Sequence, residues 1–452
     1  MPINLKIVNA KSSIVLDRWK LAKVNILASL LIKGANILLS FIIIKIVLEL
    51  IGEMEYGVWL VINSLNAFMN FFDLGLGNGL RNHLSEAMAN NNFVLAKKLV
   101  STTYFILFVI VVLFFLLYIL ISHYINWYLL FNVKLVVLPN LATLMFYVVS
   151  FFFINFYLRL ITSVIYAFQL PALNDSIFLF TNLLSFTIIY TYKDLFKGNL
   201  TSVVLLLSCS PVIILFFANI GLFLTRYSKI RPNIKFVRMP YAKKLFGLGS
   251  KFLIAQSSVF ILYYGINFIV ANICDLTSVT YYNLSYKYFS IISLVFGTII
   301  APFWNAYNEA YIKNEIIWIR TATKRILKIW VVFVIITIAL IMLSSEVFEI
   351  WVGNSIKIPF IVSVLMGLFT IVFNWNAIFG GFLNGLNMLK VSIITSLTAI
   401  IIFLFLSFLL GKVCDMKLVG ILIALLVSLL PTAFFLPKVF YNKINSFQFS
   451  QP

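Results

Sequence analysis

The chain has 452 residues, of which 62% are hydrophobic and only 11% are charged. Soluble domains are about half apolar and about a quarter charged, so this composition excludes a soluble protein. The net charge is +20, from 34 Lys and Arg against 14 Asp and Glu residues. We attribute this excess to membrane topology and to attraction toward anionic lipid headgroups. It does not require a nucleic-acid partner.

Apolar segments long enough to cross a bilayer recur along almost the whole chain. A bilayer core about 30 Å thick needs about 20 apolar residues in a helix. The alternating pattern of a membrane β-barrel is missing from the sequence, so the predicted class is all-α integral membrane protein. We predict twelve transmembrane helices, at residues 25–47, 57–80, 100–121, 136–166, 172–191, 201–224, 246–270, 279–304, 328–346, 359–386, 390–411 and 418–437.

Basic residues outside the spans predict the orientation of the chain. Residues 1–24 form a basic segment, and no small-residue cleavage site follows the first span, so we expect that span to be retained. With the N-terminus inside, 24 Lys and Arg residues fall on the cytoplasmic side and 6 on the other. Both termini, including the tail 438–452, are therefore predicted to be cytoplasmic.

The spans divide into two sets of six. A basic cytoplasmic linker, 225–245, separates a bundle at 25–224 from a bundle at 246–437. A shift of 223 residues places "RNHLSEAMANNNFVLAKK" (81–98) over "WNAYNEAYIKNEIIWIRT" (304–321) and pairs Glu86 with Glu309. We therefore predict a duplicated six-helix bundle whose halves share one orientation, with ligand sites between them.

Polar residues follow one helical face in several predicted spans, with spacings of three and four. Polar side chains can simply hold membrane helices together, and this alternative stays open for each Asn or Ser. A Lys or Arg at mid-span costs about 2.5–3.5 kcal/mol, so it is expected to face a cavity or a partner. The stripes contain Ser29, Lys33, Asn36, Ser40, Asn63, Asn66, Asn70, Asp73, Asn155, Arg159, Thr162, Tyr166, Gln169, Gln256, Tyr263, Asn267, Asn283, Lys287 and Ser290.

The charged members lie at depths that allow them to act together. At 1.5 Å per residue, Lys33 and Asp73 are both about 11–12 Å from the cytoplasmic ends of their spans, which predicts an ion pair. Arg159 is about 10 Å deep, Arg81 lies at the mouth below it, and Lys287 is in the outer half. This series of positive charges predicts an anionic ligand.

One stretch resembles a known family. The segment "YGVWLVINSLNAFMNFFDLGLGNGLRNHLSEAMANNN" (56–92) is similar to the signature of polysaccharide-repeat flippases, for O-antigen or capsule, of the multidrug/oligosaccharidyl-lipid/polysaccharide (MOP) exporter superfamily. The resemblance implies the V-shaped MOP/MATE-like fold, with the first, second, seventh and eighth helices lining a central cavity.

The resemblance also implies a function. This function is the translocation of undecaprenyl-diphosphate-linked oligosaccharide repeats from the cytoplasmic to the outer leaflet of the bacterial inner membrane. The expected mechanism is alternating access, and the expected pathway is O-antigen (lipopolysaccharide) or capsular polysaccharide biosynthesis. We expect no covalent chemistry and no cofactor, with coupling to an H⁺ or Na⁺ gradient. Expected partners are the lipid-linked glycan, membrane lipids, a polysaccharide polymerase and a chain-length regulator.

Within this picture, the stripes supply the expected substrate contacts. The predicted substrate-binding residues are Lys33, Asn36, Asn66, Asn70, Asp73, Arg81, Arg159, Tyr263, Asn267 and Lys287. Gly75, Gly77 and Gly79 are predicted to form a cytoplasmic gate, because glycine lets a helix bend and backbones approach. Tight helix packing alone is the other reading of these glycines. No metal site is expected.

Two other functions are weighed against this one. A multidrug exporter of the same superfamily is expected to carry acidic cavity residues for cationic drugs, whereas here Asp73 stands against several cations. A membrane polysaccharide polymerase or ligase is expected to carry a large outer loop, and no predicted outer loop exceeds about fifteen residues. The charge pattern therefore favours the flippase.

The orientation can be tested with single cysteines and a membrane-impermeant thiol reagent. Labels placed in 225–244 are expected to be unreachable from outside the cell, while a label at Glu53 reacts, because the first site is predicted to be cytoplasmic and the second external. The reverse labelling pattern would overturn the predicted orientation.

Overall fold

The computed structural model describes residues 28–69, 76–133, 140–242, 265–353, 356–385 and 389–448, and these are helical apart from turns and short connections. Ten described helices are long and apolar enough to cross a membrane. Nine of them lie between Phe93 and Ser446. The predicted class, an all-α membrane protein, is therefore confirmed. The predicted second and seventh spans lie partly outside the described residues.

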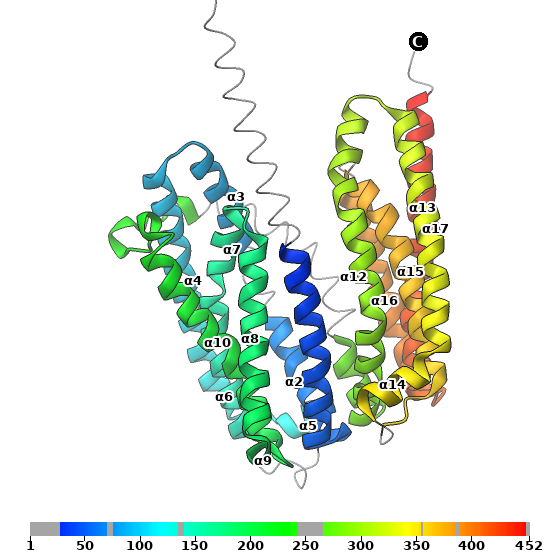
Figure 1. Ribbon diagram of the computed structural model, residues 1–452, viewed down its shortest axis with the longest axis horizontal. Coiled ribbons are helices and arrows are strands. Elements are labelled where there is room, and N and C mark those ends of the chain that lie inside the picture. Colours follow the sequence, from blue (N-terminus) through cyan, green and yellow to red (C-terminus); the bar gives the residue numbers. More distant parts are fainter. Residues whose placement is uncertain are drawn as a thin grey trace, which may run out of the picture. The chain divides into compact units, whose positions relative to one another are not determined.

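The first part of the chain supplies ten helices (Figure 1). They are the helix Ala28–Ile51, α2 (Glu53–Met69), α3 (Leu76–Ala89), α4 (Phe93–Ser122), α5 (Trp127–Phe131), α6 (Leu141–Leu158), α7 (Leu160–Ala167), α8 (Pro171–Thr191), α9 (Lys193–Phe196) and α10 (Leu200–Leu224). Two 3₁₀ turns follow, η2 (Ser228–Ile230) and η3 (Ile234–Phe236).

The second part begins with a described helix at 265–273 and continues through six further helices. They are α12 (Leu276–Ile312), α13 (Ile316–Met342), α14 (Ser344–Val352), α15 (Phe360–Gly385), α16 (Leu389–Leu406), which runs into a π-helical stretch at Ser407–Val413, and α17 (Lys417–Gln448). Helix α13 begins twelve residues before the predicted span at 328–346. Hydropathy marks the apolar length only, whereas the helix continues through the charged turns with Arg320, Lys324 and Arg325.

The predicted fourth span, 136–166, is two helices that meet at Arg159. The amide of Asn219 on α10 donates a hydrogen bond to the Leu158 carbonyl at 2.8 Å, and the Tyr104 hydroxyl donates to the Asn219 oxygen at 2.9 Å. A side chain that enters the backbone ladder is a recognised cause of a helix kink. Asn219 therefore stabilises the break at which Arg159 lies.

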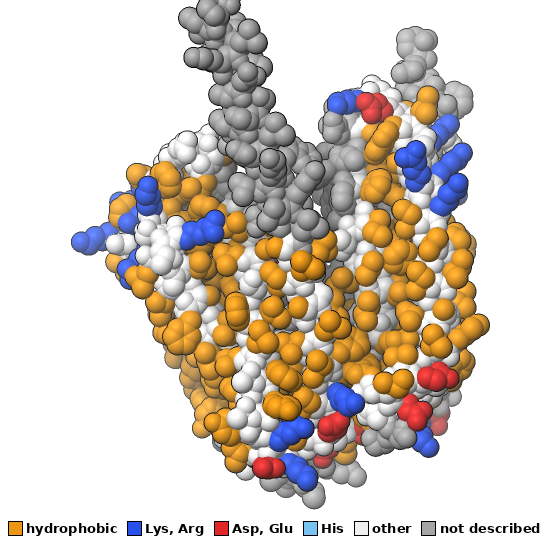
Figure 2. Space-filling model, viewed as in Figure 1, with side chains coloured by type: hydrophobic (Ala, Val, Ile, Leu, Met, Phe, Trp, Pro, Cys, Tyr) orange, Lys and Arg blue, Asp and Glu red, His pale blue; other side chains and the backbone are white. Residues whose placement is uncertain are grey.

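The described residues fall into two compact units. Unit 1 lies within Met1–Gly52, Met69–Trp127 and Leu135–Ile254, and unit 2 within Glu53–Phe68, Tyr128–Lys134 and Ala255–Pro452. Helix α2 thus groups with the second unit, although it belongs to the predicted first bundle. On the face in Figure 2, hydrophobic side chains cover the middle of each unit and charged ones gather toward its ends, as a bilayer requires.

The 223-residue shift also relates helix boundaries. Helix α2 begins at Glu53 and α12 at Leu276, 223 residues later. The same shift relates the end of α3 at Ala89 to the end of α12 at Ile312. Helix α12 is therefore the uninterrupted counterpart of α2 and α3, between which residues 70–75 are not described.

The turn after these helices repeats in detail. Asn91 and Asn314 both adopt positive φ, 52° and 58°. The backbone N–H of Asn92 donates to the Ala87 carbonyl at 2.9 Å, and that of Glu315 donates to the Ala310 carbonyl at 2.8 Å. Asn tolerates this left-handed conformation better than most residues. The two turns therefore have the same local geometry at the predicted 223-residue shift.

Part of the core of unit 2, near the C-terminal end of α12, is a cluster of aromatic side chains. The rings of Tyr307 and Phe382 stack at 3.9 Å, and the Tyr307 hydroxyl lies 2.7 Å from that of Thr323 on α13. Phe379 and Phe440 close the cluster, each fully buried. These contacts join α12, α13, α15 and α17 into one body.

Gly57 offers a test of the close packing in unit 2. A Cβ atom there would lie 2.0 Å from the Leu276 carbonyl oxygen, and backbone cannot yield as a flexible side chain can. We expect Gly57→Ala to lower the apparent melting temperature of the purified protein by several degrees, because overpacking costs about 1–3 kcal/mol. Gly34→Ala is the control, since its Cβ would meet nothing within 4 Å. Equal melting temperatures for the two variants would contradict this account.

Candidate functional site

The polar stripe of the first span faces α8 within unit 1, where the two helices run side by side (Figure 1). The Ser29 hydroxyl donates to the Asp175 carboxylate, and the Lys33 ammonium lies 3.8 Å from the same oxygen. Two turns further on, the Asn182 amide donates to the Asn36 oxygen at 2.6 Å. Helix α8 thus presents a matching stripe, which the sequence analysis did not identify.

Asp175 and Lys33 differ in exposure. The Asp175 side chain is 9% exposed, whereas that of Lys33 is 48% exposed. A buried carboxylate needs hydrogen bonds to offset its lost hydration, and Ser29 supplies one. The ion pair itself is half exposed and therefore weak. The Asp175 carboxylate is therefore held by Ser29, while the Lys33 ammonium stays partly accessible.

The expected pair between Lys33 and Asp73 lies outside the described residues, because Asp73 falls in 70–75. The contact that the structure shows for Lys33 is with Asp175. The sequence contained a signal for Asp175: it stands five residues into α8, with Asn182 seven residues later on the same helical face.

Tyr166 on α7 lies close to the residues around Asp175 and to two arginines. The Arg81 guanidinium lies over the Tyr166 ring, 5.0 Å from its centroid. The Asn174 amide donates to the Tyr166 hydroxyl at 2.9 Å. Arg159 lies seven residues before Tyr166, at the junction of α6 and α7. Tyr166 therefore stands where α3, α7 and α8 bring their polar groups together.

We name this region the unit 1 polar cluster. Its members are Ser29, Lys33, Arg81, Arg159, Tyr166, Asn174 and Asp175. The cluster contains three cations and one carboxylate, so it carries an excess of positive charge. Arg81 and Arg159 are exposed. The Asn174 side-chain oxygen is buried and has no hydrogen-bond partner within the described chain, so it can accept one more hydrogen bond.

The predicted residues of unit 2 form a separate chain of hydrogen bonds. The Asn267 amide donates to the Ser64 hydroxyl on α2 at 2.6 Å, and the Asn283 amide on α12 donates to the Asn267 oxygen at 2.8 Å. Ser64 and Asn267 are 2% and 5% exposed. Asn267 therefore joins three helices, which matches the packing alternative for polar residues in spans.

Lys287 lies one turn beyond Asn283 on α12 and is half-buried. Several other predicted residues cannot be placed. Asn66 belongs to α2, but its side chain is outside the described atoms; Asn70, Asp73, Gly75 and Tyr263 lie in undescribed segments. For these residues the binding and gating roles stay predictions.

Gly77 and Gly79 lie in the first turn of α3, and both are buried. They were predicted to end one span, 57–80, of which the structure describes α2 up to Met69 and α3 from Leu76. Helix α3 packs against α4 and α7. The described contacts fit a gate and tight packing equally well.

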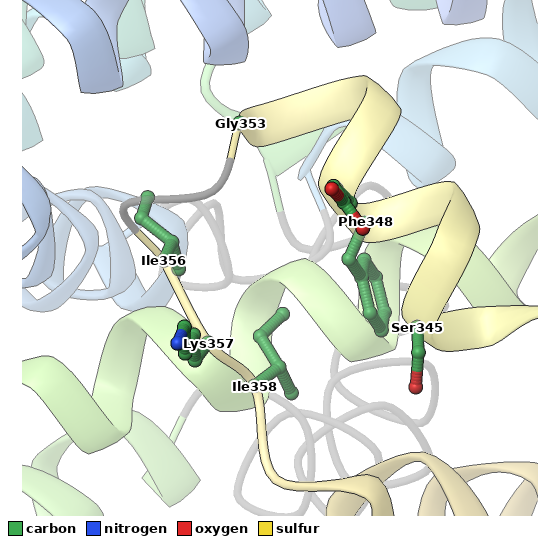
Figure 3. A pocket seen from close by; sticks show the side chains of 7 residues that line it. Ser345, Phe348, Gly353, Ile356, Lys357 and Ile358 are labelled. Atoms are coloured by element: carbon green, nitrogen blue, oxygen red, sulfur yellow. The ribbon is translucent and has the colours of Figure 1, made fainter.

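A cavity of about 450 Å³ lies elsewhere in unit 2, at the end of α14 (Figure 3). Phe348 and Ile356 form part of its apolar wall, and Glu349 and Lys357 supply opposite charges. It is lined by Ser345, Phe348, Glu349, Gly353, Ile356, Lys357 and Ile358. None of the predicted site residues lines this cavity.

Three solved structures have a similar fold. An inward-facing multidrug resistance MATE family transporter of the MOP superfamily has a TM-score of 0.70 at 13% identity, over 88% of this chain and 95% of that one. An outward-facing one has 0.64 at 12%, over 95% and 97%. A MOP superfamily transporter from Pyrococcus furiosus, described as having a binding pocket of reverse polarity that suggests a different function, has 0.60 at 13%, over 94% and 95%.

No protein-family model and no curated protein matches the sequence. Identities of 12–13% establish the fold alone. The chain therefore has the fold of MOP superfamily transporters over most of its length, as the resemblance implied.

The Lys33 and Asp175 contact can be tested by a double-mutant cycle. Asp175→Asn keeps an oxygen for the Ser29 hydroxyl but removes the charge, so it should lower the apparent melting temperature. Adding Lys33→Met should recover part of that loss, because it removes the unpaired ammonium; the coupling is expected to be about 0.5–1 kcal/mol for a half-exposed pair. Asp194→Asn in exposed α9, combined with Lys33→Met, is the control. Strictly additive effects of Lys33→Met and Asp175→Asn would show that the pair contributes nothing.

Proposed function

We propose that the protein is a flippase for undecaprenyl-diphosphate-linked oligosaccharide repeats. The observation that carries the proposal is the unit 1 polar cluster, in which Lys33, Arg81 and Arg159 outnumber the single carboxylate of Asp175. A site with this charge excess suits an anionic headgroup. The MOP transporter fold supports transport in preference to a covalent reaction.

The side chains of the cluster fit the parts of such a substrate. Arginine offers a planar fork of donors that matches phosphate oxygens, and lysine adds a point charge. Arg81 and Arg159 would take the diphosphate. Asn36, Asn174 and the Tyr166 hydroxyl are donors and acceptors of the kind that sugar hydroxyls need.

The pair between Lys33 and Asp175 gives the substrate a way to change the protein. An incoming phosphate competes with the carboxylate for the Lys33 ammonium, which is half exposed. Once Lys33 turns to the phosphate, the contact between the first helix and α8 loses one of its interactions. A ligand shifts a conformational equilibrium only through such a difference in contacts. Binding and rearrangement would be coupled here.

The remaining residues have proposed roles of a different kind. Lys287 would meet acidic sugars, and Asn267 would hold helices together through its bonds to Ser64 and Asn283. Gly77 and Gly79 would allow the first turn of α3 to bend. Coupling to an H⁺ or Na⁺ gradient and association with a polymerase are part of the same proposal.

A second candidate is a multidrug exporter. It is favoured by Asp175, a buried carboxylate that the sequence analysis did not weigh, and two of the similar structures are multidrug transporters. A cationic drug would, however, have to approach three cations. Direct binding of a cationic dye and of a diphosphate lipid distinguishes the two candidates.

The flippase proposal predicts the effect of removing either arginine. Arg81→Gln and Arg159→Gln are each expected to weaken binding of an undecaprenyl-diphosphate-linked saccharide by about tenfold or more, since hydrogen bonds to charged groups contribute about 1.5–3 kcal/mol. Binding is measured on the purified protein in nanodiscs. Undecaprenyl monophosphate should bind more weakly, with a smaller effect of each substitution.

Lys193→Gln is the matched control, because Lys193 also lies over a tyrosine ring, that of Tyr190, but at the far end of α8. It should leave binding unchanged. The proposal fails if both arginine variants bind the diphosphate lipid as the unchanged protein does. Saturable binding of a cationic dye that is lost in Asp175→Asn would instead support the multidrug exporter.

A further inference from the structure

The first residues of the predicted linker, 225–242, are packed onto unit 1. Tyr227 and Ile230 are buried, at 1% and 2% exposure, and the Tyr227 ring lies 4.7 Å from that of Phe168. Burial raises the pKa of Tyr227, a change that the charge of Arg226 opposes. These two side chains anchor the segment to the bundle.

Two hydrogen bonds fix the segment to α4. The backbone N–H of Asn233 donates to the Ser101 hydroxyl at 3.0 Å, and that of Arg238 donates to the Thr102 hydroxyl at 3.0 Å. Ser101 and Thr102 are buried. Because these hydroxyls engage backbone groups, the segment has a defined path along the first turns of α4.

This arrangement gathers positive charge. Five cations of the segment are exposed, and two more stand on the first turns of α4. They are Arg226, Lys229, Arg231, Lys235, Arg238, Lys97 and Lys98, which we name the basic rim. Neither 93–98 nor 225–242 contains an Asp or Glu residue. Figure 2 shows Lys and Arg side chains gathered at the left edge of unit 1, where Figure 1 draws this segment in green.

Apolar side chains are interleaved with the basic rim. Ile234, Val94 and Met239 are 75%, 59% and 56% exposed. The Lys97 ammonium lies over the Phe236 ring at 4.5 Å, and the Lys229 ammonium over the Phe93 ring at 5.1 Å. Basic residues beside exposed apolar ones are typical of segments that lie in a membrane interface.

The basic rim also lies at the ends of membrane-length helices. Arg226 comes two residues after Leu224, where a membrane-length helix ends, and Lys97 stands in the second turn of another, Phe93–Ser122. Two independent helix ends therefore place these cations at the boundary of the bilayer core, where phosphate groups of lipids lie.

We propose that the basic rim, with Ile234 and Met239, is a binding surface for anionic phospholipid headgroups. The cations contact the phosphates, and the apolar side chains enter the region just below them. A soluble acidic partner would explain the charge but not the exposed Ile234 and Met239 at bilayer level. The proposal does not depend on which substrate the protein carries.

The test measures local lipid composition at the rim. A fluorescent label is attached to Met239→Cys in a protein whose three native cysteines are changed to alanine. The protein is placed in vesicles of phosphatidylcholine with one-fifth phosphatidylglycerol, and a spin-label quencher is carried either by the phosphatidylglycerol or by an equal amount of phosphatidylcholine. We expect quenching by labelled phosphatidylglycerol to exceed that by labelled phosphatidylcholine by about twofold or more, since each basic residue attracts anionic lipid.

Changing Arg226, Lys229, Arg231 and Lys235 to Gln should bring this ratio close to one. Arg238 is kept, because its guanidinium donates to the carbonyls of Lys235 and Val237 and so holds the turn. The matched control changes four cations of unit 2, Lys324, Arg325, Lys328 and Lys438, to Gln and should leave the ratio unchanged.

Three results would overturn the proposal. One is equal quenching by labelled phosphatidylglycerol and labelled phosphatidylcholine in the protein whose basic rim is unchanged. Another is an equal fall in the control variant, which would reflect net charge alone. The third is little quenching by either lipid together with protection of the label by added polyglutamate, which would assign the surface to an acidic polypeptide.

Discussion

A carboxylate buried between two membrane helices must find hydrogen-bond donors and a counter-charge, and in unit 1 this requirement centres on Asp175. Ser29 and Lys33 approach it from the first described helix, and Asn174, beside it on α8, reaches Tyr166 on α7. Tyr166 in turn lies under Arg81 of α3. Contacts of Asp175 and of its neighbour Asn174 therefore link four helices, in a cluster that contains three cations and one carboxylate.

Backbone irregularity serves the same region. Arg159 stands at a break between α6 and α7 that Asn219 stabilises by bonding the Leu158 carbonyl. A straight helix would satisfy that carbonyl itself. The break costs a ladder bond, and the buried amide of Asn219 replaces it. The structure thus uses a polar residue on a third helix to position a charged one.

Polar residues in the two units have different uses despite the duplicated design. In unit 2, Asn267 bonds to Ser64 and Asn283, and both Ser64 and Asn267 are buried. In unit 1, the comparable stripe includes a half-exposed lysine and stands near two exposed arginines. The helix ends and the turns at Asn91 and Asn314 follow the 223-residue shift, whereas the charged side chains do not. The basic rim adds a further asymmetry, since α4 is covered by the segment after α10.

The sequence by itself determined the class of the protein, the apolar lengths of most spans and the repeat, because hydropathy and a 223-residue shift are local or linear properties of the chain. It also singled out Lys33, Arg81 and Arg159, since a charge in an apolar segment is conspicuous without any structure. Only the tertiary structure could decide that Asp175 meets Lys33, that Asn267 is engaged in packing, and that 225–242 is docked onto α4. Helical spacing fixes which residues share a face of one helix. Which faces of different helices meet depends on the packing of the whole bundle, and that information is not contained in any single segment.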